Sequence, residues 1–120
     1  ADLLGRARGA LLRRATDPWK SDLGGIMNTV VPESRIPSHQ APDARTVDPD
    51  LDVVTMAVKV PETLGHVHLW TVRLARGADG DDVLRALAGS TRIARVRIGH
   101  GLRGINVIKE LALDLGRPRA

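Results

Sequence analysis

Two runs of apolar residues in the middle of the chain predict neighbouring β-strands. Residues 52–60 are rich in β-branched side chains and end at Pro61, and residues 66–75 form a second run of strand-like composition. Apolar runs of this length that stop at a residue unable to donate to a ladder are typical of strands. Because the connection over residues 61–65 is short, we expect the two strands to lie side by side and antiparallel.

The first part of the chain predicts less regular structure. Residues 1–5 resemble the end of a helix, Gly5 and Gly9 are expected to bracket a turn, and residues 10–14 form a short apolar strand. Residues 15–50 contain five prolines and many polar side chains, which predicts a long connection with little regular structure. A loop this long inside a compact domain is usually functional or disordered.

Helical spacing dominates the last third of the chain. Asp79 is a candidate N-cap for a helix whose apolar residues lie at 83, 84 and 87, and residues 105–115 show the spacing of a second helix that Gly116 ends. Between them, residues 92–98 alternate Arg with apolar side chains, which favours a half-exposed strand. Together these patterns predict an α+β fold, with three or four strands in a mostly antiparallel mixed sheet and two helices on one face.

The composition indicates which side chains form the core and excludes some kinds of chemistry. The 120 residues fit one domain, Phe and Tyr are absent, and two Trp are the only aromatic residues, so we expect an aliphatic core. The absence of Cys excludes a disulfide, a thiolate metal site and a cysteine nucleophile within these residues. No apolar run is long enough to cross a bilayer and the first residues do not form a signal peptide, so we expect a cytoplasmic protein without a membrane partner. Both ends look cut from a longer chain.

The net charge of +4 is compatible with several partners. An excess of basic side chains favours the binding of nucleic acid or of a phosphorylated small molecule. The same excess is also found on ordinary solvated surfaces. The basic side chains are scattered except in one segment, which contains Arg92, Arg95, Arg97 and Arg103. Arginine binds phosphate and carboxylate through two parallel hydrogen bonds, so this segment is a candidate anion-binding strand.

Three of the four histidines lie in two short motifs. His66 and His68 are two residues apart on an expected strand, which places both imidazoles on one face. A metal site would need a third ligand that no nearby cluster supplies, so we expect no metal. A general acid or base needs only one well-placed histidine. A pair on a solvent-facing surface remains the alternative.

The second motif is a polar loop between two prolines. Ser38, His39 and Gln40 lie between Pro37 and Pro42, and their hydroxyl, imidazole and amide groups suit the binding of a phosphate or a carbonyl oxygen. An ordinary surface turn has the same composition. The pair Arg13-Arg14 at a strand end is likewise either an anion contact or a surface pair.

The order of several short motifs carries a resemblance to a known family. The motifs are RRATDP (13–18), GIMNTVVP (25–32), IPSHQAPD (36–43), TVDPDL (46–51), TMAVKVP (55–61) and HVH (66–68). In this order and spacing they resemble the catalytic domain of the archaeal-type (type II) glyceraldehyde-3-phosphate dehydrogenases. The stretch ELALDLGRPRA (110–120) is similar to the next helix and turn of that family.

The resemblance implies an enzyme of which this chain is only a part. Residues 1–120 would belong to the catalytic (C-terminal) domain, and the Rossmann domain and the nucleophilic cysteine would lie outside the chain, so the fragment alone is expected to be inactive. The implied reaction oxidises glyceraldehyde 3-phosphate with inorganic phosphate and NAD or NADP, through a cysteine thiohemiacetal and a thioester. The resemblance also implies a homotetramer, and sheets of this kind often pair across subunit interfaces.

The resemblance also assigns residue roles. Arg14 matches an arginine that contacts the cofactor. His39 and Gln40 match a pair of histidines in the substrate-binding loop that includes Ser38. His66 matches the histidine expected to activate the thiol as a base, with His68 as the alternative. A histidine beside a thiol favours the nucleophilic thiolate.

Two departures keep other functions open. Gln40 stands where the family has a second histidine, and Ala41 stands where it has a glycine. A related aldehyde or semialdehyde dehydrogenase with another substrate therefore remains an alternative. The other alternative, from a different class, is a non-catalytic module that binds an anion or nucleic acid through its Arg-rich strand.

Overall fold

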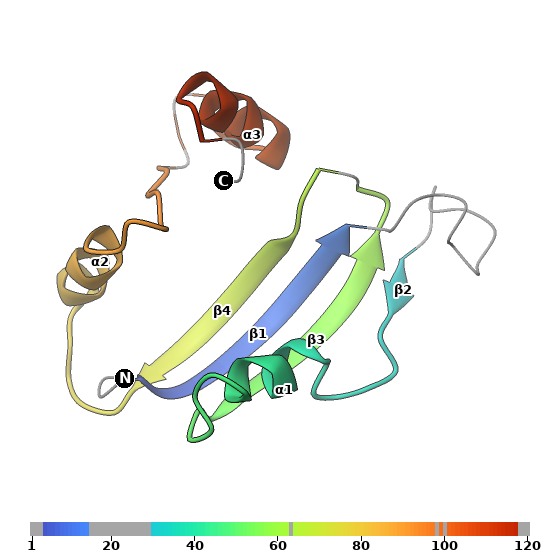
Figure 1. The fold of residues 1–120 in the computed structure, drawn as a ribbon, viewed down its shortest axis with the longest axis vertical. Coiled ribbons are helices and arrows are strands. Elements are labelled where there is room, and N and C mark those ends of the chain that lie inside the picture. Colours follow the sequence, from blue (N-terminus) through green and yellow to red (C-terminus); the bar gives the residue numbers. More distant parts are fainter. Residues whose placement is uncertain (1–3, 15–29, 63, 98, 100, 118–120) are drawn as a thin grey trace. The chain divides into compact units, whose positions relative to one another are not determined.

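The computed structural model describes residues 4–14, 30–62, 64–97, 99 and 101–117. The chain divides into two compact units, Ala1–Gly77 and Ala78–Ala120. The first unit contains, in chain order, β1 (Leu4–Arg14), β2 (Val31–Pro32), α1 (Gln40–Arg45), β3 (Val53–Val60) and β4 (Val67–Leu74) (Figure 1). The second contains α2 (Gly80–Ala88) and α3 (Ile105–Asp114). The predicted α+β class is confirmed.

The four strands form one mixed sheet in the order β2-β3-β1-β4. Strand β1 runs parallel to β3 and antiparallel to β4, and β2 runs antiparallel to β3, so the sheet is mostly antiparallel as predicted. The expectation that β3 and β4 are neighbours is wrong, because β1 lies between them and Ala7 pairs with both Val53 and Val72. Neighbouring strands are about 4.8 Å apart, so the connection over residues 61–66 is long enough to pass over one intervening strand.

Strand β1 is longer than its sequence suggested. It covers Leu4–Arg14 without a turn at Gly5 or Gly9, so the predicted turn is wrong. The strand predicted over residues 10–14 is confirmed, but it begins at Leu4. Gly9 lies opposite Trp70, and a Cβ atom at Gly9 would be 2.6 Å from the indole ring. The glycine therefore makes room for a cross-strand aromatic side chain. The expected helix end over residues 1–5 is wrong for Leu4 and Gly5, which lie in β1, and residues 1–3 lie outside the described residues.

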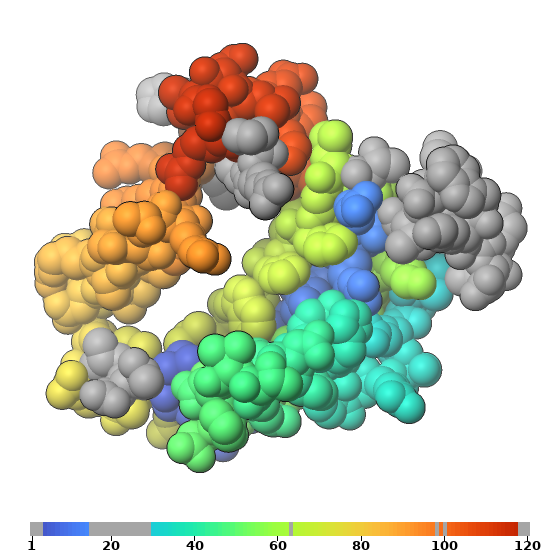
Figure 2. All heavy atoms as spheres, in the orientation of Figure 1, coloured from blue at the N-terminus to red at the C-terminus, as the bar shows by residue number. Residues whose placement is uncertain are grey.

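The core of the first unit lies between the sheet and α1. Ala7, Ala41 and Val53 form a buried cluster, with Ala44 and Leu51 packed against it. Figure 2 shows the atoms of α1, in green, lying over part of the sheet. The core is aliphatic, as the composition predicts.

Helix α1 and strand β2 lie inside the segment where we expected little regular structure. Pro42 lies in the first turn of α1, where a proline is tolerated. Six residues are too few to show a helical period, so the helix depends on tertiary contacts. Arg45 supplies two of them, because its guanidinium donates to the carbonyl oxygens of Leu51 at 3.2 Å and Val53 at 2.8 Å. Residues 15–29, the rest of the expected loop, lie outside the described residues.

The second unit contains the two predicted helices. A reciprocal capping box between Asp79 and Asp82 begins α2, and Gly116 with φ +70° follows α3. The packing of these helices on a face of the sheet stays a prediction, because the two units are described separately. None of the described helices combines the length and the apolar character needed to cross a membrane.

The expected strand over residues 92–98 is wrong for the part that the structure describes. Residues 92–97 form neither helix nor strand, and Ile98 lies outside the described residues. Among the described residues of this unit there is no strand that could supply hydrogen bonds. The segment with alternating Arg and apolar side chains therefore has no neighbouring strand with which to pair. The arginine-rich segment therefore does not present the flat anion-binding strand that the non-catalytic alternative needs.

Candidate active site

The sequence-predicted site residues of the first unit lie along the second half of β1, on both sides of this strand. Arg13 and Arg14 are the last two residues of this strand. The Arg13 side chain faces the loop that carries His39, and the Arg14 backbone contacts His66. Each of the two histidine motifs is therefore connected to one of the last two residues of β1, His66 directly and His39 through Glu33.

The loop from β2 to α1 is held against β3 by backbone hydrogen bonds. The amide of Glu33 donates to the carbonyl oxygen of Ala57 at 2.9 Å, and the amide of Ser38 donates to that of Thr55 at 2.8 Å. These bonds fix both ends of the loop to one strand. His39 follows directly as the N-cap residue of α1, so its backbone position is set by β3.

Ser38 is buried beneath this loop. Its side chain is 0% exposed, and Oγ lies 2.7 Å from Thr55 Oγ1 and 2.7 Å from Gln40 Oε1. Gln40 is half-buried and His39 is exposed. The structure therefore brings the three predicted substrate-binding residues together, with Ser38 behind the two that reach the surface.

Glu33 connects His39 to the end of β1. One carboxylate oxygen lies 3.4 Å from Nδ1 of His39, and the other lies 3.5 Å from a terminal nitrogen of Arg13. Donation from Nδ1 of His39 to this carboxylate leaves Nε2 as the outer ring nitrogen. The chain of contacts from Arg13 through Glu33 to His39 thus orients the imidazole.

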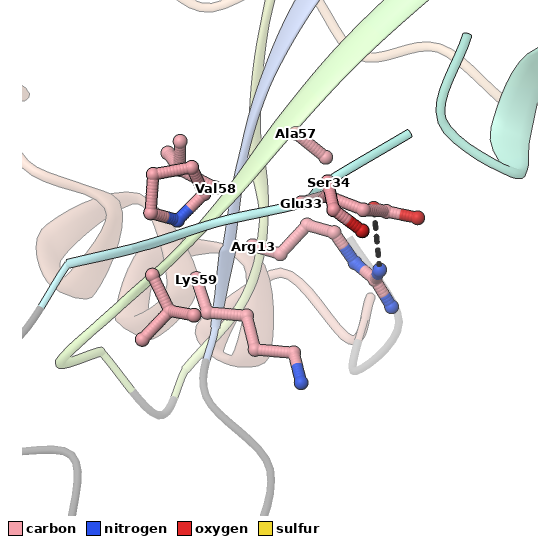
Figure 3. Close-up of a pocket in the computed structure, with 8 residues that line it drawn as sticks. Arg13, Glu33, Ser34, Ala57, Val58 and Lys59 are labelled. Carbon is pink, nitrogen blue, oxygen red and sulfur yellow. Dashed lines mark ion pairs between the residues drawn. The ribbon is translucent and has the colours of Figure 1, made fainter. Parts of the chain in front are cut away.

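A cavity of about 300 Å³ lies beside this ion pair. Figure 3 shows Arg13, Glu33, Ser34 and Lys59 around it, with the Arg13–Glu33 ion pair drawn as a dashed line. The buried Nε atom of Arg13 has no hydrogen-bond partner among the described residues. Two cationic side chains against one carboxylate leave one net positive charge, so the cavity favours an anion.

His66 is held at the beginning of β4 by the backbone of β1. The amide of Arg14 donates to Nδ1 of His66 at 2.9 Å. Because Nδ1 accepts this bond, the proton of the neutral imidazole is on Nε2. His66 therefore presents an N–H donor away from β1. The side chain of Arg14 is exposed.

His68 has a different environment on the same face. Its ring stacks on that of His66, with centroids 6.3 Å apart and planes 12° apart, and meets Trp70 edge-on at 6.3 Å. Burial, and secondly the neighbouring His66, lower the pKa of His68 below the ordinary value of 6.5. The His68 imidazole is therefore neutral at pH 7 and able to accept a proton.

The two histidines have complementary chemical abilities. His66 offers a hydrogen-bond donor and His68 a neutral ring, which together suit the stabilisation of a thiolate or an oxyanion and the uptake of a proton. The described residues contain no group of three or more His, Asp or Glu side chains arranged to hold a metal ion. The roles assigned to His66, His68, Ser38, His39, Gln40 and Arg14 stay predictions.

Sequence reasoning missed three members of the site. Thr55 and Lys59 were assigned only to an apolar strand, and Glu33 only to a loop. Thr55 carries a usable signal, since a polar residue at a buried strand position requires a partner. Lys59, which interrupts the apolar run just before Pro61, is a weaker signal. Glu33 carries none, because its role depends on two contacts from other elements.

Comparison with known proteins identifies the chain. Residues 14–112 match the family profile described as glyceraldehyde 3-phosphate dehydrogenase, C-terminal domain. Proteins named glyceraldehyde-3-phosphate dehydrogenase are similar to it in Halobacterium salinarum (44% identity over 115 residues) and Methanopyrus kandleri (44% over 117). These alignments cover 95% and 97% of this chain but 34% and 33% of the relatives, respectively.

A third relative of the same name, from Thermoplasma volcanium, is 44% identical over 110 residues, which is 92% of this chain and 32% of that protein. The chain thus spans about a third of the length of the curated relatives it matches. The resemblance read from the ordered motifs is confirmed by these matches. The chain belongs to the family of glyceraldehyde 3-phosphate dehydrogenase C-terminal domains.

Proposed function

We propose that this chain is part of the catalytic domain of a phosphorylating glyceraldehyde-3-phosphate dehydrogenase. The observation that carries the proposal is the convergence at the end of β1 of a cationic cavity and two histidine motifs. The names of the relatives support the substrate assignment. The Rossmann domain and the nucleophilic cysteine are proposed to lie in the rest of the protein.

In this proposal the cationic cavity holds the phosphate of the triose phosphate. Arg13 and Lys59 supply positive charge, and His39 and Gln40 supply hydrogen-bond donors from the adjoining loop. A charged ligand held at one end keeps its aldehyde in a fixed position relative to the nucleophile, which is the main benefit of such a clamp. Glu33 keeps the net charge of the cavity small, so the bound product can leave.

His66 and His68 handle the proton of the cysteine thiol. The neutral ring of His68 takes the proton of the thiol, and the resulting thiolate attacks the aldehyde carbon. The Nε2–H of His66 then stabilises the negative charge that develops on sulfur or on the aldehyde oxygen. For His66 to act as the base itself, its ring would have to give up the bond from Arg14.

The cofactor is a nicotinamide dinucleotide, NAD or NADP, which supplies a hydride acceptor when bound. Arg14 is the residue of this chain that we propose to contact it, since an exposed guanidinium at a strand end fits a phosphate or ribose oxygen. After hydride transfer, inorganic phosphate attacks the resulting thioester, forms the acyl phosphate and releases the thiol. We place the reaction in the cytoplasm, in glycolysis or gluconeogenesis.

A homotetramer is also proposed. The sheet face opposite α1 carries Met56 and Leu69, which are 52% and 60% exposed. Both pair with Ala10 in the sheet, three residues from buried Ala7, and so belong to the face away from α1. A sheet face on which the first unit itself exposes apolar side chains fits the pairing of sheets between subunits.

A related aldehyde or semialdehyde dehydrogenase is the second candidate. Gln40 favours it, because the amide is neutral where the family's substrate loop is expected to have an imidazole. A substrate with a carboxylate or hydroxyl in place of the phosphate needs less positive charge at that point.

The test is an activity screen of the full-length protein. Reduction of NAD or NADP is followed with glyceraldehyde 3-phosphate and with non-phosphorylated aldehydes and semialdehydes, each with and without inorganic phosphate. We expect the highest kcat/KM with glyceraldehyde 3-phosphate and a strict dependence on phosphate. A preference of tenfold or more for a semialdehyde would support the second candidate, and no activity with any aldehyde would refute both.

A further inference from the structure

Three aromatic rings follow one another along the beginning of β4. His66, His68 and Trp70 are alternate residues, so their side chains lie on the same face of the sheet. The planes of the His66 and His68 rings are 12° apart, whereas the indole of Trp70 meets the His68 ring edge-on at 71°. Both centroid distances are 6.3 Å. The imidazole of His68 therefore has an aromatic ring on either side.

The His68 imidazole is held by these rings without a hydrogen bond. In the part of the chain that the structure describes, neither nitrogen of its ring has a hydrogen-bond partner. His66 differs, because the Arg14 amide donates to its Nδ1 at 2.9 Å. Rotation of an imidazole about its last side-chain bond is otherwise broadly permitted. The orientation of the His68 ring therefore depends on its contacts with His66 and Trp70.

The indole of Trp70 has a fixed place on the neighbouring strand. Trp70 pairs with Gly9 of β1, and a Cβ atom at Gly9 would lie 2.6–2.9 Å from Cζ3, Cη2 and Cε3 of the indole. The ring thus lies over the backbone where only a glycine leaves room, although a glycine inside a strand weakens it. Trp70 is still 47% exposed, so core packing alone does not account for this fit.

We propose that Trp70 is a positioning residue that holds the His68 imidazole in the orientation needed to take a proton from the thiol. The proposal rests on the proposed function and goes beyond it, because it adds a residue that takes no proton itself. Edge-on contact with an aromatic ring is a favourable arrangement with a defined geometry. His66 bounds the ring of His68 on one side and Trp70 bounds it on the other.

The same contact affects the protonation of His68. Burial, and secondly His66, lower its pKa, and the indole is one of the groups that cover the ring. Within the first unit β1 is the only described element in contact with β4. Its one charged residue on this face from Ala7 onward is Arg13, which is paired with Glu33. Loss of the indole should therefore raise the pKa of His68 towards its ordinary value.

A purely structural role for Trp70 is the competing explanation. A large side chain on a sheet also stabilises the fold by covering its neighbours, and its loss then lowers Tm without a selective effect on proton transfer. Val72 is a matched control, because it is the next residue of β4 on the same face and is 48% exposed. Truncation of Val72 removes apolar contacts from this face but leaves both rings beside His68.

The experiment compares Trp70→Leu, Trp70→Phe and Val72→Ala with the wild-type full-length enzyme. Tm, kcat and KM are measured for each, with kcat/KM as a function of pH. In Trp70→Leu we expect kcat to fall roughly tenfold with KM changed less than twofold, and the acid limb of kcat/KM to move to higher pH. Trp70→Phe keeps a ring and should retain most of kcat, and Val72→Ala should retain all of it. An unchanged kcat and acid limb in Trp70→Leu, or the same losses in Val72→Ala, would overturn the proposal.

Gly9→Ala gives an independent test from the other strand. It displaces the indole without changing the ring, so it should lower kcat in the same way as Trp70→Leu, and it decides the matter if Trp70→Leu does not fold. In the double variant the two substitutions should cost no more kcat than Trp70→Leu alone, because both act through the same contact. Additive losses in kcat would overturn the proposal.

Tryptophan fluorescence makes the two proposals fail separately, because it needs no turnover. A protonated imidazole in contact with an indole quenches its emission. The difference in emission between wild type and His68→Asn should therefore change as the pH falls through the pKa of His68, and the same comparison in a Trp70→Phe background should show no change. This titration in a protein that lacks dehydrogenase activity would support the contact and refute the proposed function. Normal activity without the titration would do the opposite.

Discussion

Asp52 shows how single residues stabilise the first unit. Its carboxylate accepts hydrogen bonds from Arg6 at 2.8 Å and from Arg8 at 3.0 Å. The bond from Arg6, and next that from Arg8, lower the pKa of Asp52 below its ordinary value of 3.8. Because Asp52 lies just before β3 and both arginines lie on β1, this cluster joins the two parallel strands at their beginning.

Asp52→Asn should lower Tm by a small amount at pH 7. A carboxyl whose folded pKa is depressed stabilises the fold above its unfolded pKa, and this contribution is lost as the pH falls through the folded pKa. The difference in Tm between wild type and variant should therefore shrink below about pH 3.8. Asp50→Asn removes the same charge from an exposed position and should change Tm less at pH 7. Equal effects of the two variants at every pH would contradict this account.

Lys59→Met should raise KM for glyceraldehyde 3-phosphate roughly tenfold, since one charge-assisted contact is worth about 1.5 kcal/mol. The chemical step does not use this ammonium, so kcat should change little. Lys59→Arg should retain most of the affinity. Arg92→Met removes an exposed cation from the other unit and serves as the control. A fall in kcat without a change in KM would argue against a phosphate contact at Lys59.

At the scale of elements, the sequence pattern predicts those helices and strands that are long enough for a side-chain period to repeat. The runs at β3 and β4 and the spacing of α2 and α3 are clear because side-chain alternation or helical spacing repeats along each of them. Strand β1 is hard to recognise in the sequence because two glycines interrupt its pattern. These glycines are needed because the neighbouring strand lies close to them. Helix α1 has only six residues and contains a proline. Strand order also depends on pairing between distant segments, which no local period encodes.

The fit between Gly9 and Trp70 is a direct test of the β1–β4 pairing. A Cβ atom at position 9 would lie within 2.6–2.9 Å of three ring carbons, so Gly9→Ala must displace the indole. We expect a loss of about 1–3 kcal/mol in the free energy of unfolding and a changed tryptophan fluorescence spectrum. Gly65→Ala introduces a Cβ with no atom within 4 Å and should be nearly neutral. Equal stability of the two variants would contradict the pairing.

At the scale of the whole molecule, the site is only partly visible in the sequence. The order of the motifs assigns Ser38, His39, Gln40 and His66 to a family, and the structure adds that both motifs are connected to the last residues of β1. Glu33, Thr55 and Lys59 could not be assigned because their partners come from other strands. Buried polar contacts of this kind depend on tertiary packing, which local sequence does not specify.

Assembly is tested at the sheet face opposite α1, where Leu69 is exposed. Leu69→Lys places a charge in an apolar surface that is proposed to be buried between subunits, which is strongly unfavourable. Light scattering of the full-length protein should show a tetramer for wild type and smaller species for the variant. Val47→Lys changes a side chain that is 87% exposed on the α1 side and should leave the tetramer intact. If Leu69→Lys is still a tetramer, the subunit interface does not include this sheet face.

We propose above that His66 and His68, beside the end of β1, handle the proton of the thiol in a glyceraldehyde-3-phosphate dehydrogenase. The most direct measurement is the steady-state rate of nicotinamide reduction by the full-length protein with glyceraldehyde 3-phosphate and phosphate, beside His66→Asn and His68→Asn. We predict an active wild type and a fall in kcat of roughly 10²-fold or more in each variant, with little change in KM. An active wild type whose kcat survives both substitutions would contradict the claim.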